Sequence, residues 1–281
     1  MPYKTVLVHC NDKSRMARIL GAATQVAAEF QAHLIGLSVT PPVVIIPTGM
    51  PGTPDTMVID EHCKAYRRDN PEMKAAFEIA GRARNVALEW READAGSTSV
   101  AEIVLQHARA ADLIVAAQTD TKWPGSRRLD IADRLVLGSG RPVLIIPNEG
   151  PQRHVGERVL VAWNARREAT RAVFDALPLL QRAKEVRVIW VNPQSEGELG
   201  QDIPAADICI ALARHGVKCE ATQSVQPRTN VGQTLLTYAK DCRADLLVMG
   251  CYGHSRLREF VLGGASEHVL RHLSIPVLMS H

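Results

Sequence analysis

The residues with the clearest chemical potential are four glycines near the end of the chain. Gly250 and Gly253 follow an apolar run at 246–249, and Gly263 and Gly264 come after a nine-residue spacer. Glycine lets backbone N–H groups turn toward a ligand with no side chain in the way. The residues after Gly264 read as a helix start, where free N–H groups and a partial positive charge attract anions. The stretch therefore predicts a phosphate cradle, and the alternative is a tight turn that needs only backbone freedom.

Side chains around these glycines offer other chemistry. In the spacer, His254 could assist phosphate contact or proton transfer and Arg256 could meet phosphates, but both residue types are also common on ordinary loops and surfaces. Cys251 is either a thiol activated by nearby N–H donors or a small filler residue. His268 and His272 are four residues apart, a spacing that can bind a metal from one helical face. No glutamate follows His268 as in zinc proteases, so we expect no metal site.

The composition argues against several function classes. The length of 281 residues suggests about two domains of ordinary size, and 46% hydrophobic with 22% charged residues is globular. The net charge of +3 is spread out with no run of five like charges, so we expect no nucleic-acid partner. No apolar run approaches the roughly 18 residues of a membrane span, and no signal peptide is evident. We expect a cytoplasmic protein with no membrane partner, whose six cysteines are free thiols.

An internal repeat divides the chain into two copies. Three apolar segments of the first copy recur in the second in the same order: 6–11 as 159–164, 111–117 as 244–250, and 141–146 as 275–280. The offset falls along the chain, so the first copy carries extra length in its middle. The polar residues at 147–157 include Pro and Gly and have the composition of a linker. We predict two domains, 1–150 and 151–281.

Within each copy, short apolar runs alternate with longer amphipathic segments. The predicted strands lie near 4–10, 32–39, 86–92, 113–117 and 143–146 in the first copy, and near 158–163, 186–191, 217–225, 246–249 and 275–278 in the second. The predicted helices of the second copy lie near 166–183, 204–215 and 231–242, and from 265 onward. This alternation predicts an α/β fold with two tandem doubly wound domains, each with a five-stranded parallel sheet. The Pro- and Gly-rich insert at 41–54 is either a cover packed over the sheet edge or a contact surface for another subunit.

The spacing Gly250-x2-Gly253-x9-Gly263 resembles the nucleotide loop of universal stress proteins, in which Ser or Thr follows the third glycine. The flanking runs at 244–249 and 275–278 are similar as well. The resemblance covers essentially the whole chain as a tandem pair of the bacterial kind. It implies two Rossmann-like domains packed as an intramolecular pseudo-dimer.

Two positions depart from the family pattern. Gly264 stands where a hydroxyl residue is expected, which leaves Ser266 as a substitute, and Asn164 stands where binding members carry an aspartate. Asparagine can still donate and accept hydrogen bonds to an adenine, or it caps the helix that follows. The resemblance assigns the nucleotide to these residues: Ala162, Trp163, Asn164, Val191, Met249, Gly250, Tyr252, Gly253, His254, Arg256, Gly263, Gly264, Ala265 and Ser266.

The first copy has lost the glycines of this motif. Ala117 and Asp120 stand where the first two glycines should be, and Leu129 and Asp130 stand where the last two should be. A carboxylate beside a phosphate is repulsive. We therefore expect a nucleotide in the second copy and a degenerate site in the first.

The function predicted from these features is that of a stress-response or regulatory protein. It would bind ATP or a related adenine nucleotide in the second copy, with or without Mg²⁺ and without a redox cofactor. Any hydrolysis is expected to be slow, because no general base or metal-holding carboxylate is evident near the loop. The alternatives are an interaction protein that binds no nucleotide and a true nucleotide hydrolase. The expected partners are a second copy of the chain or another protein. Family members usually dimerise through the last strand, and a tandem chain can satisfy that contact internally.

Overall fold

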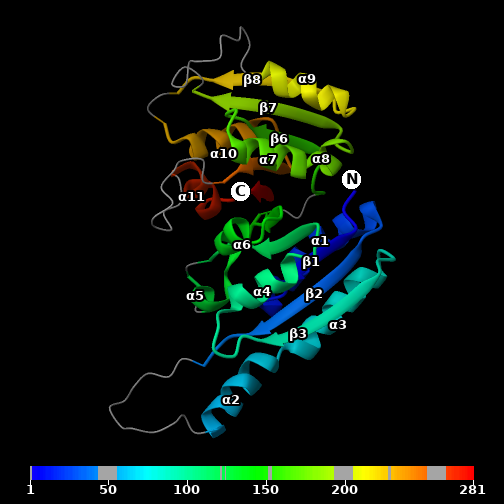
Figure 1. Ribbon diagram of the computed structural model, residues 1–281, viewed down its shortest axis with the longest axis vertical. Coiled ribbons are helices and arrows are strands. Elements are labelled where there is room, and N and C mark those ends of the chain that lie inside the picture. Colours follow the sequence, from blue (N-terminus) through cyan, green and yellow to red (C-terminus); the bar gives the residue numbers. More distant parts are fainter. Residues whose placement is uncertain are drawn as a thin grey trace.

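One ten-stranded sheet runs through the whole molecule, with helices on both faces (Figure 1). The structure is a computed structural model, and it describes residues 2–43, 56–120, 122–123, 125–150, 154–192, 205–226, 229–251 and 264–281. The strands follow the order β3-β2-β1-β4-β5-β10-β9-β6-β7-β8 across the sheet. The first five strands of the chain form one half of the sheet and the last five form the other, so the predicted α/β class and the tandem arrangement are confirmed.

The elements alternate as the repeat predicts. Those of the first half are β1 (Thr5–His9), the 3-10 helix η1 (Lys13–Arg15), α1 (Met16–Phe30), β2 (His33–Thr40), α2 (Thr56–Arg67), α3 (Asn70–Arg82), β3 (Leu88–Asp94), α4 (Val100–Ala108), β4 (Leu113–Ala117), α5 (Ser126–Leu129), α6 (Ala132–Gly138) and β5 (Val143–Ile146). Those of the second half are β6 (Arg158–Ala162), α7 (Arg167–Asp175), α8 (Leu177–Leu180), β7 (Glu185–Val191), α9 (Ala206–Arg214), β8 (Cys219–Ser224), α10 (Val231–Asp241), β9 (Leu246–Gly250), α11 (Gly264–Arg271) and β10 (Val277–Ser280).

The two halves join through their last strands. All strand pairs within a half are parallel, whereas β5 and β10 pair antiparallel, with Leu144 opposite Leu278. Both leucines are fully buried. The last strands of the two halves therefore pair inside this chain, as the pseudo-dimer expectation requires.

A repeated aspartate ties neighbouring strands together in each half. Asp112 precedes β4 and accepts hydrogen bonds from the backbone N–H groups of Lys4 and Thr5, at 2.7 and 2.9 Å. Asp245 precedes β9 and accepts in the same way from Gly156 and Arg158, at 2.9 and 3.1 Å. Asp245 is 2% exposed, and burial raises the pKa of its carboxyl above the usual range. The Ala-Asp repeat seen in the sequence is thus a device that aligns the first strand of each half with the fourth.

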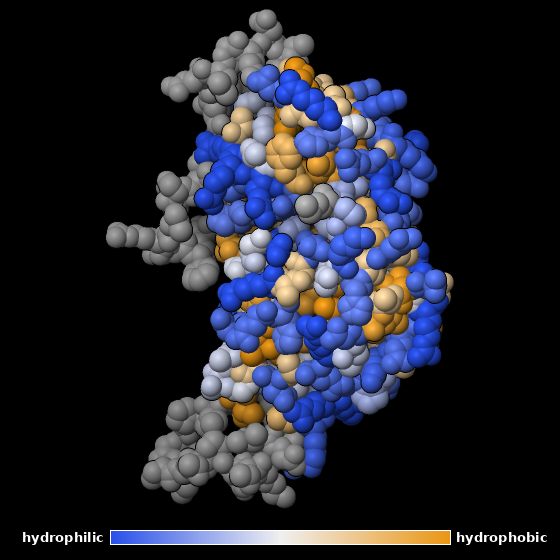
Figure 2. Space-filling model, turned by 45° about the vertical axis from the view of Figure 1, so that its right-hand side comes forward, coloured by the Kyte–Doolittle hydropathy of each residue, from blue (hydrophilic) through white to orange (hydrophobic). Residues whose placement is uncertain are grey.

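Each face of the sheet carries its own hydrophobic core, and each core continues across the seam between the halves. On one face, Val8 and Val115 of the first half belong to the same cluster as Val161 and Val248 of the second. On the other face a second cluster is formed under α4, α6, α10 and α11. Strands buried on both faces read as continuous apolar runs, which is why 113–117 and 246–249 could be identified without alternation. Figure 2 shows that the outer surface in that view is mostly hydrophilic, with hydrophobic residues in small separate groups.

One expectation about the helices is corrected. The helix predicted at 166–183 is two helices, α7 and α8, because Pro178 in the first turn of α8 has no N–H to donate to the previous turn. The extra length of the first half consists of α2 and α3 between β2 and β3. Most of the insert at 41–54 lies outside the described residues. None of the described helices is long and apolar enough to cross a membrane.

Side-chain hydrogen bonds also cross the seam between the halves. Gln118, which follows β4, donates to the carbonyl oxygens of Leu270 and Arg271 at the end of α11, at 2.9 and 3.3 Å. Tyr3 donates to the carbonyl oxygen of Asp175 at the end of α7, at 2.7 Å. The segment that connects the halves is held by Gln25 of α1, which both donates to and accepts from the backbone of Val155. The relative position of the halves is therefore fixed by polar contacts as well as by the sheet.

Candidate functional site

In the second half, the strand order changes direction at β6, because later strands are added on both sides of it. From β6 the chain continues to β7 on one side, while β9 lies on the other, so Ala162 is opposite Ile189 and Val161 is opposite Val248. Such a switch point leaves a crevice outside the carboxyl ends of the two strands, where ligands bind in doubly wound folds. Among the described residues, the ends of β6 and β9 carry five of the predicted site residues, Ala162, Trp163, Asn164, Met249 and Gly250. The pairing of these two strands brings the Asn164 turn and Gly250 to the same edge of the sheet.

The turn after β6 begins with Trp163 and Asn164. Trp163 is half-buried and its N–H donates to the Ile189 carbonyl oxygen at 2.9 Å, which extends the sheet by one bond. Asn164 is exposed, and its Oδ1 accepts from the N–H of Arg166 at 3.2 Å. Arg166 itself is the N-cap residue of α7, so Asn164 shapes the approach to the helix rather than capping it. Ala165 between them has a φ of 57°, a left-handed conformation that is strained for a non-glycine residue. Such strain is often found at functional sites.

Gly250 at the end of β9 has a packing reason to be glycine. A Cβ at this position would lie 2.4 Å from the backbone nitrogen of Ala169 and 2.7 Å from the carbonyl oxygen of Glu168. The first turn of α7 thus lies directly on the end of β9. This contact is compatible with both roles considered for Gly250, a tight turn and a part of a ligand site. The close approach also places α7 beside the switch point.

The start of α11 is attached to α10 by Asn230. Asn230 Oδ1 accepts from the N–H groups of Gly232 and Gln233 as the N-cap of α10, and its Nδ2 donates to the carbonyl oxygen of Gly264 at 3.4 Å. Gly264 is exposed, and among the described residues a Cβ there would meet only Asn230 Nδ2, at 3.9 Å. Packing against the described part of the chain therefore does not require a glycine at position 264.

The remaining predicted site residues divide into three groups. Ala162, Val191 and Ala265 are partly buried, with Val191 ending the neighbouring strand β7. Met249 and Ser266 are buried, at 4% and 5% exposure. Ser266 shares the inner face of α11 with Val269 and Leu270, so its hydroxyl points to the protein rather than to solvent. Lying outside the described residues are Tyr252, Gly253, His254, Arg256 and Gly263.

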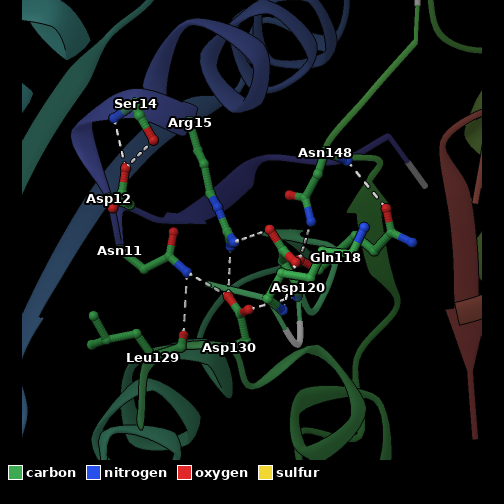
Figure 3. A network of polar contacts seen from close by, with 10 residues as sticks. Asn11, Asp12, Ser14, Arg15, Gln118, Asp120, Leu129, Asp130 and Asn148 are labelled. Carbon is green, nitrogen blue, oxygen red and sulfur yellow. Dashed lines mark hydrogen bonds and ion pairs between the residues drawn. The ribbon is translucent and has the colours of Figure 1, made fainter. Parts of the chain in front are cut away.

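The matching switch point of the first half is filled by an ion-pair network (Figure 3). Arg15 Nη1 lies 2.7 Å from Asp130 Oδ1, and Arg15 Nη2 lies 3.7 Å from Asp120 Oδ2. The guanidinium also stacks over the ring of Trp123, 4.2 Å from its centroid. Asn11, at the end of β1, donates to Asp130 Oδ1 at 3.0 Å. The side chain of Asp130 is fully buried, so this network is part of the fold and not a surface contact.

Backbone groups complete the same network. Asp130 Oδ2 accepts from the N–H of Asp120 at 2.8 Å, and Asp120 Oδ1 accepts from the N–H of Lys122 at 2.9 Å. In the neighbouring turn, Asp12 accepts from the N–H of Ser14 at 2.7 Å and so caps η1 (Figure 3). The loop of the first half is therefore held by its own carboxylates, in the place where the family pattern has glycines.

The repeat shows why the second half cannot build this network. Position 15 of the first half corresponds to Glu168 in the second, and position 130 corresponds to Gly264. The sequence predicted the role of Asp130 as a lost glycine, but not its partner. Arg15 lies six residues after β1, on the short helix η1. The sequence signal for its pairing with Asp130 is the opposite charge of the two residues, considered together with the offset of the repeat.

In the part of the chain that the structure describes, no metal cluster coincides with the predicted site. No group of three or more His, Cys, Asp or Glu suited to a metal occurs in the described ranges. The rings of His268 and His272 stack on each other, with centroids 4.3 Å apart, and burial together with the charge of His272 lowers the pKa of His268. A hollow of about 240 Å³ lies at the seam, between α1, the connecting segment and Pro276.

Comparisons with known proteins agree with this architecture. The universal stress protein family matches residues 156–281. A universal stress protein of Synechocystis is 48% identical over 150 residues, which cover 52% of this chain and 49% of that protein. The chain thus spans about half the length of this curated relative.

Solved structures match over nearly the whole chain. A universal stress protein from Archaeoglobus fulgidus has a TM-score of 0.73 at 18% identity, covering 98% of this chain and 95% of its own. A functionally unknown protein from Pseudomonas aeruginosa has a TM-score of 0.60 at 16% identity, covering 99% and 92%. At these identities the likeness concerns the fold. The second half of the chain, residues 156–281, thus matches the universal stress protein family, and the chain as a whole shares the fold of these solved structures.

Proposed function

We propose that this chain binds ATP or a related adenine nucleotide at the switch point between β6 and β9. The two domains would be 1–150 and 151–281. The second would hold the nucleotide and the first would serve as its structural partner. Asn164 and the end of β7 would face the base, and the stretch from Gly250 to Gly264 would face the phosphates.

The observation that carries this proposal is the difference between the two switch points. In the first half, the switch point is occupied by the ion pair between Arg15 and the buried carboxylate of Asp130. In the second half, the corresponding residues are Glu168 and Gly264, which cannot form that pair. A doubly wound fold that seals one of its two switch points with charged side chains and keeps an exposed glycine at the other favours a ligand at the second.

Binding without fast turnover fits these residues best. The backbone of Glu168 lies against Gly250 at the end of β9, and its carboxylate, 14% exposed, lies 3.5 Å from the Arg167 guanidinium. This carboxylate is engaged by Arg167 rather than left free to activate a water molecule. We therefore propose a nucleotide-responsive regulatory protein in which any ATP hydrolysis is slow.

The alternative is a family member that binds no nucleotide and acts through protein partners. Two observations favour it. Gly250 is already explained by its contact with α7, and Asn164 Oδ1 is engaged by Arg166. Under this alternative the glycines serve the fold and contact no nucleotide.

The first test identifies what the purified chain carries. The protein is prepared without added nucleotide and denatured, and the released small molecules are separated and weighed by mass spectrometry. Titration calorimetry with ATP follows on the emptied protein. The proposal expects an adenine nucleotide or a measurable heat of binding, and an empty protein that also ignores saturating ATP would refute it.

Position 264 gives the matched variants. Gly264→Ser adds the hydroxyl of the family pattern without a clash, and one added hydrogen bond of about 1 kcal/mol should tighten ATP binding roughly fivefold. Gly264→Asp recreates the carboxylate of the first half and should abolish binding by repulsion. Ser274→Asp places the same charge beyond the far end of α11 and should change the affinity little. Equal affinities of all three variants would place any nucleotide elsewhere.

A further inference from the structure

Two of the six cysteines lie against each other at the outer edge of the second half. Cys209 is on α9 and Cys219 is the first residue of β8, the last strand of the sheet; Figure 1 shows α9 beside β8 at the upper end of the molecule. Cys219 Sγ lies 3.9 Å from the carbonyl oxygen of Cys209, and both side chains pack against the same hydrophobic cluster. The two cysteines are therefore neighbours before any oxidation occurs.

The turn between α9 and β8 holds the two thiols in this position. Gly216 adopts a φ of +79°, which glycine tolerates without strain. The N–H of Val217 donates to the Leu212 carbonyl oxygen at 3.1 Å, and the Val217 side chain is 2% exposed. The end of α9 and the start of β8 are thus held together by the turn that joins them.

The other four cysteines are placed differently. Cys10 and Cys251 are buried, at 1% and 0% exposure, and Cys242 donates to the Ala239 carbonyl oxygen at 3.6 Å. Cys63 is on α2 in the first half. Cys209 and Cys219 are both half-buried, so a small oxidant can reach them from the surface.

We propose that Cys209 and Cys219 form an oxidisable thiol pair, which hydrogen peroxide converts into a disulfide that joins α9 to β8. Reaction would begin at Cys219. Its sulfur, as thiolate, attacks one peroxide oxygen, the O–O bond breaks, and water leaves after protonation, which gives a sulfenic acid. The Cys209 sulfur then attacks the sulfenic sulfur, the S–O bond breaks, and the Cys209 proton leaves with the hydroxide as a second water. The pair loses two electrons and the peroxide gains them.

The protonation of the pair sets this order. Burial and the neighbouring Cys219 raise the pKa of Cys209 to about 12, so at neutral pH Cys209 keeps its proton. An S–H group at this position can release its proton to the leaving hydroxide in the second step. Thiolates, not thiols, react with peroxides, so the protonated Cys209 is the resolving thiol and the first attack falls to its neighbour in the pair.

The test uses the full chain, fully reduced and then treated with hydrogen peroxide in small molar excess. Thiols are counted under denaturing conditions, and a non-reducing peptide map identifies their partners. The expected result is the loss of two of the six thiols, a linked peptide that contains Cys209 and Cys219, and full recovery with dithiothreitol.

Single variants separate this pair from general thiol oxidation. Cys209→Ser should stop the reaction at a sulfenic acid on residue 219, trapped by dimedone, because the resolving thiol is gone. Cys219→Ser should leave Cys209 reduced. Cys242→Ser, which removes a half-buried thiol outside the pair, should leave the linked peptide unchanged. The proposal is overturned if wild-type Cys209 and Cys219 stay reduced, oxidise separately to sulfinic acids, or link only between chains.

Discussion

At the scale of single residues, corresponding positions in the two halves carry residues of different chemistry. Asp130 is a fully buried carboxylate that accepts from Arg15, Asn11 and the backbone of Asp120. Gly264, its counterpart, is exposed, and among the described residues a Cβ there would meet only Asn230 Nδ2. Aspartate matched by an arginine at one switch point, and glycine at the corresponding position of the other, give the two switch points different chemistry.

The first prediction concerns that ion pair. Asp130→Asn should lower the free energy of unfolding by about 3 kcal/mol, because it leaves the guanidinium of Arg15 buried without its main partner. Asp120→Asn, at a position 37% exposed and 3.7 Å from Arg15, should cost less than about 1 kcal/mol. Urea unfolding of both variants measures the difference. A smaller cost for Asp130→Asn than for Asp120→Asn would show that the network adds little stability.

A second prediction concerns the pH dependence of stability. His9 in β1 is 1% exposed, its Nε2 has no hydrogen-bond partner in the described part of the chain, and burial lowers its pKa to about 4. Between pH 6.5 and 4 the unfolded chain binds a proton at His9 that the folded chain does not bind. Stability should therefore fall by about 3 kcal/mol as the pH is lowered through this window.

Urea unfolding at several pH values checks the His9 prediction. His9→Leu should flatten the slope between pH 6.5 and 4, while His215→Gln, at an exposed position, should leave it unchanged. If both variants keep the wild-type slope, another group causes it.

At the scale of elements, helix ends are attached to parts of the molecule far away in the sequence. The end of α11 receives Gln118 from the first half, and the start of α11 receives Asn230 from α10. Helix ends have unpaired carbonyl and N–H groups that need such partners. The element that opens the proposed nucleotide site is thus held at both ends by residues that no local pattern identifies.

The third prediction tests the attachment of α11. Gln118→Leu should destabilise the chain by about 2 kcal/mol, because it leaves buried carbonyl groups of α11 without a donor. Gln181→Leu removes a similar bond, to the His215 carbonyl oxygen at 2.9 Å, but at an exposed position, and should cost less than about 0.5 kcal/mol. Thermal unfolding of the two variants gives the comparison, and equal shifts would contradict a special role for the seam.

At the scale of the whole molecule, the chain supplies its own partner. The antiparallel pair of β5 and β10 makes one sheet of two repeats and buries both last strands. Neither half presents its last strand to solvent. An exposed edge of this length and hydrophobicity would otherwise attract another chain.

The fourth prediction follows from this arrangement. A fragment of residues 151–281 would expose the edge of β10, whose Val277, Leu278 and Met279 are fully buried in the full chain. We expect the fragment to associate into dimers through β10, with twice the monomer mass in light scattering at micromolar concentration. A folded fragment, judged by circular dichroism, that stays monomeric would contradict this expectation.

The sequence by itself determined the repeat and most of the strand and helix order, and it predicted where the chemistry lies. Fully buried strands such as 113–117 and 246–249 are continuous apolar runs, and the spacing of Gly250 and Gly264 is visible without any structure. These features are local, because they depend on neighbours within a few positions of the chain. The sequence also identified Asp130 as a lost glycine. The helix break before Pro178 was not predicted, because the apolar pattern continues through this proline.

The tertiary structure alone decided which distant residues meet. Arg15 and Asp130 are 115 positions apart and Gln118 and Leu270 are 152 positions apart, and only strand pairing brings them into contact. The same holds for Gly250, whose close contact with α7 depends on how a helix lies on the sheet. Local patterns encode which elements form because backbone conformation is set by near neighbours. The partners of side chains are set by packing, which the order of residues along the chain does not reveal.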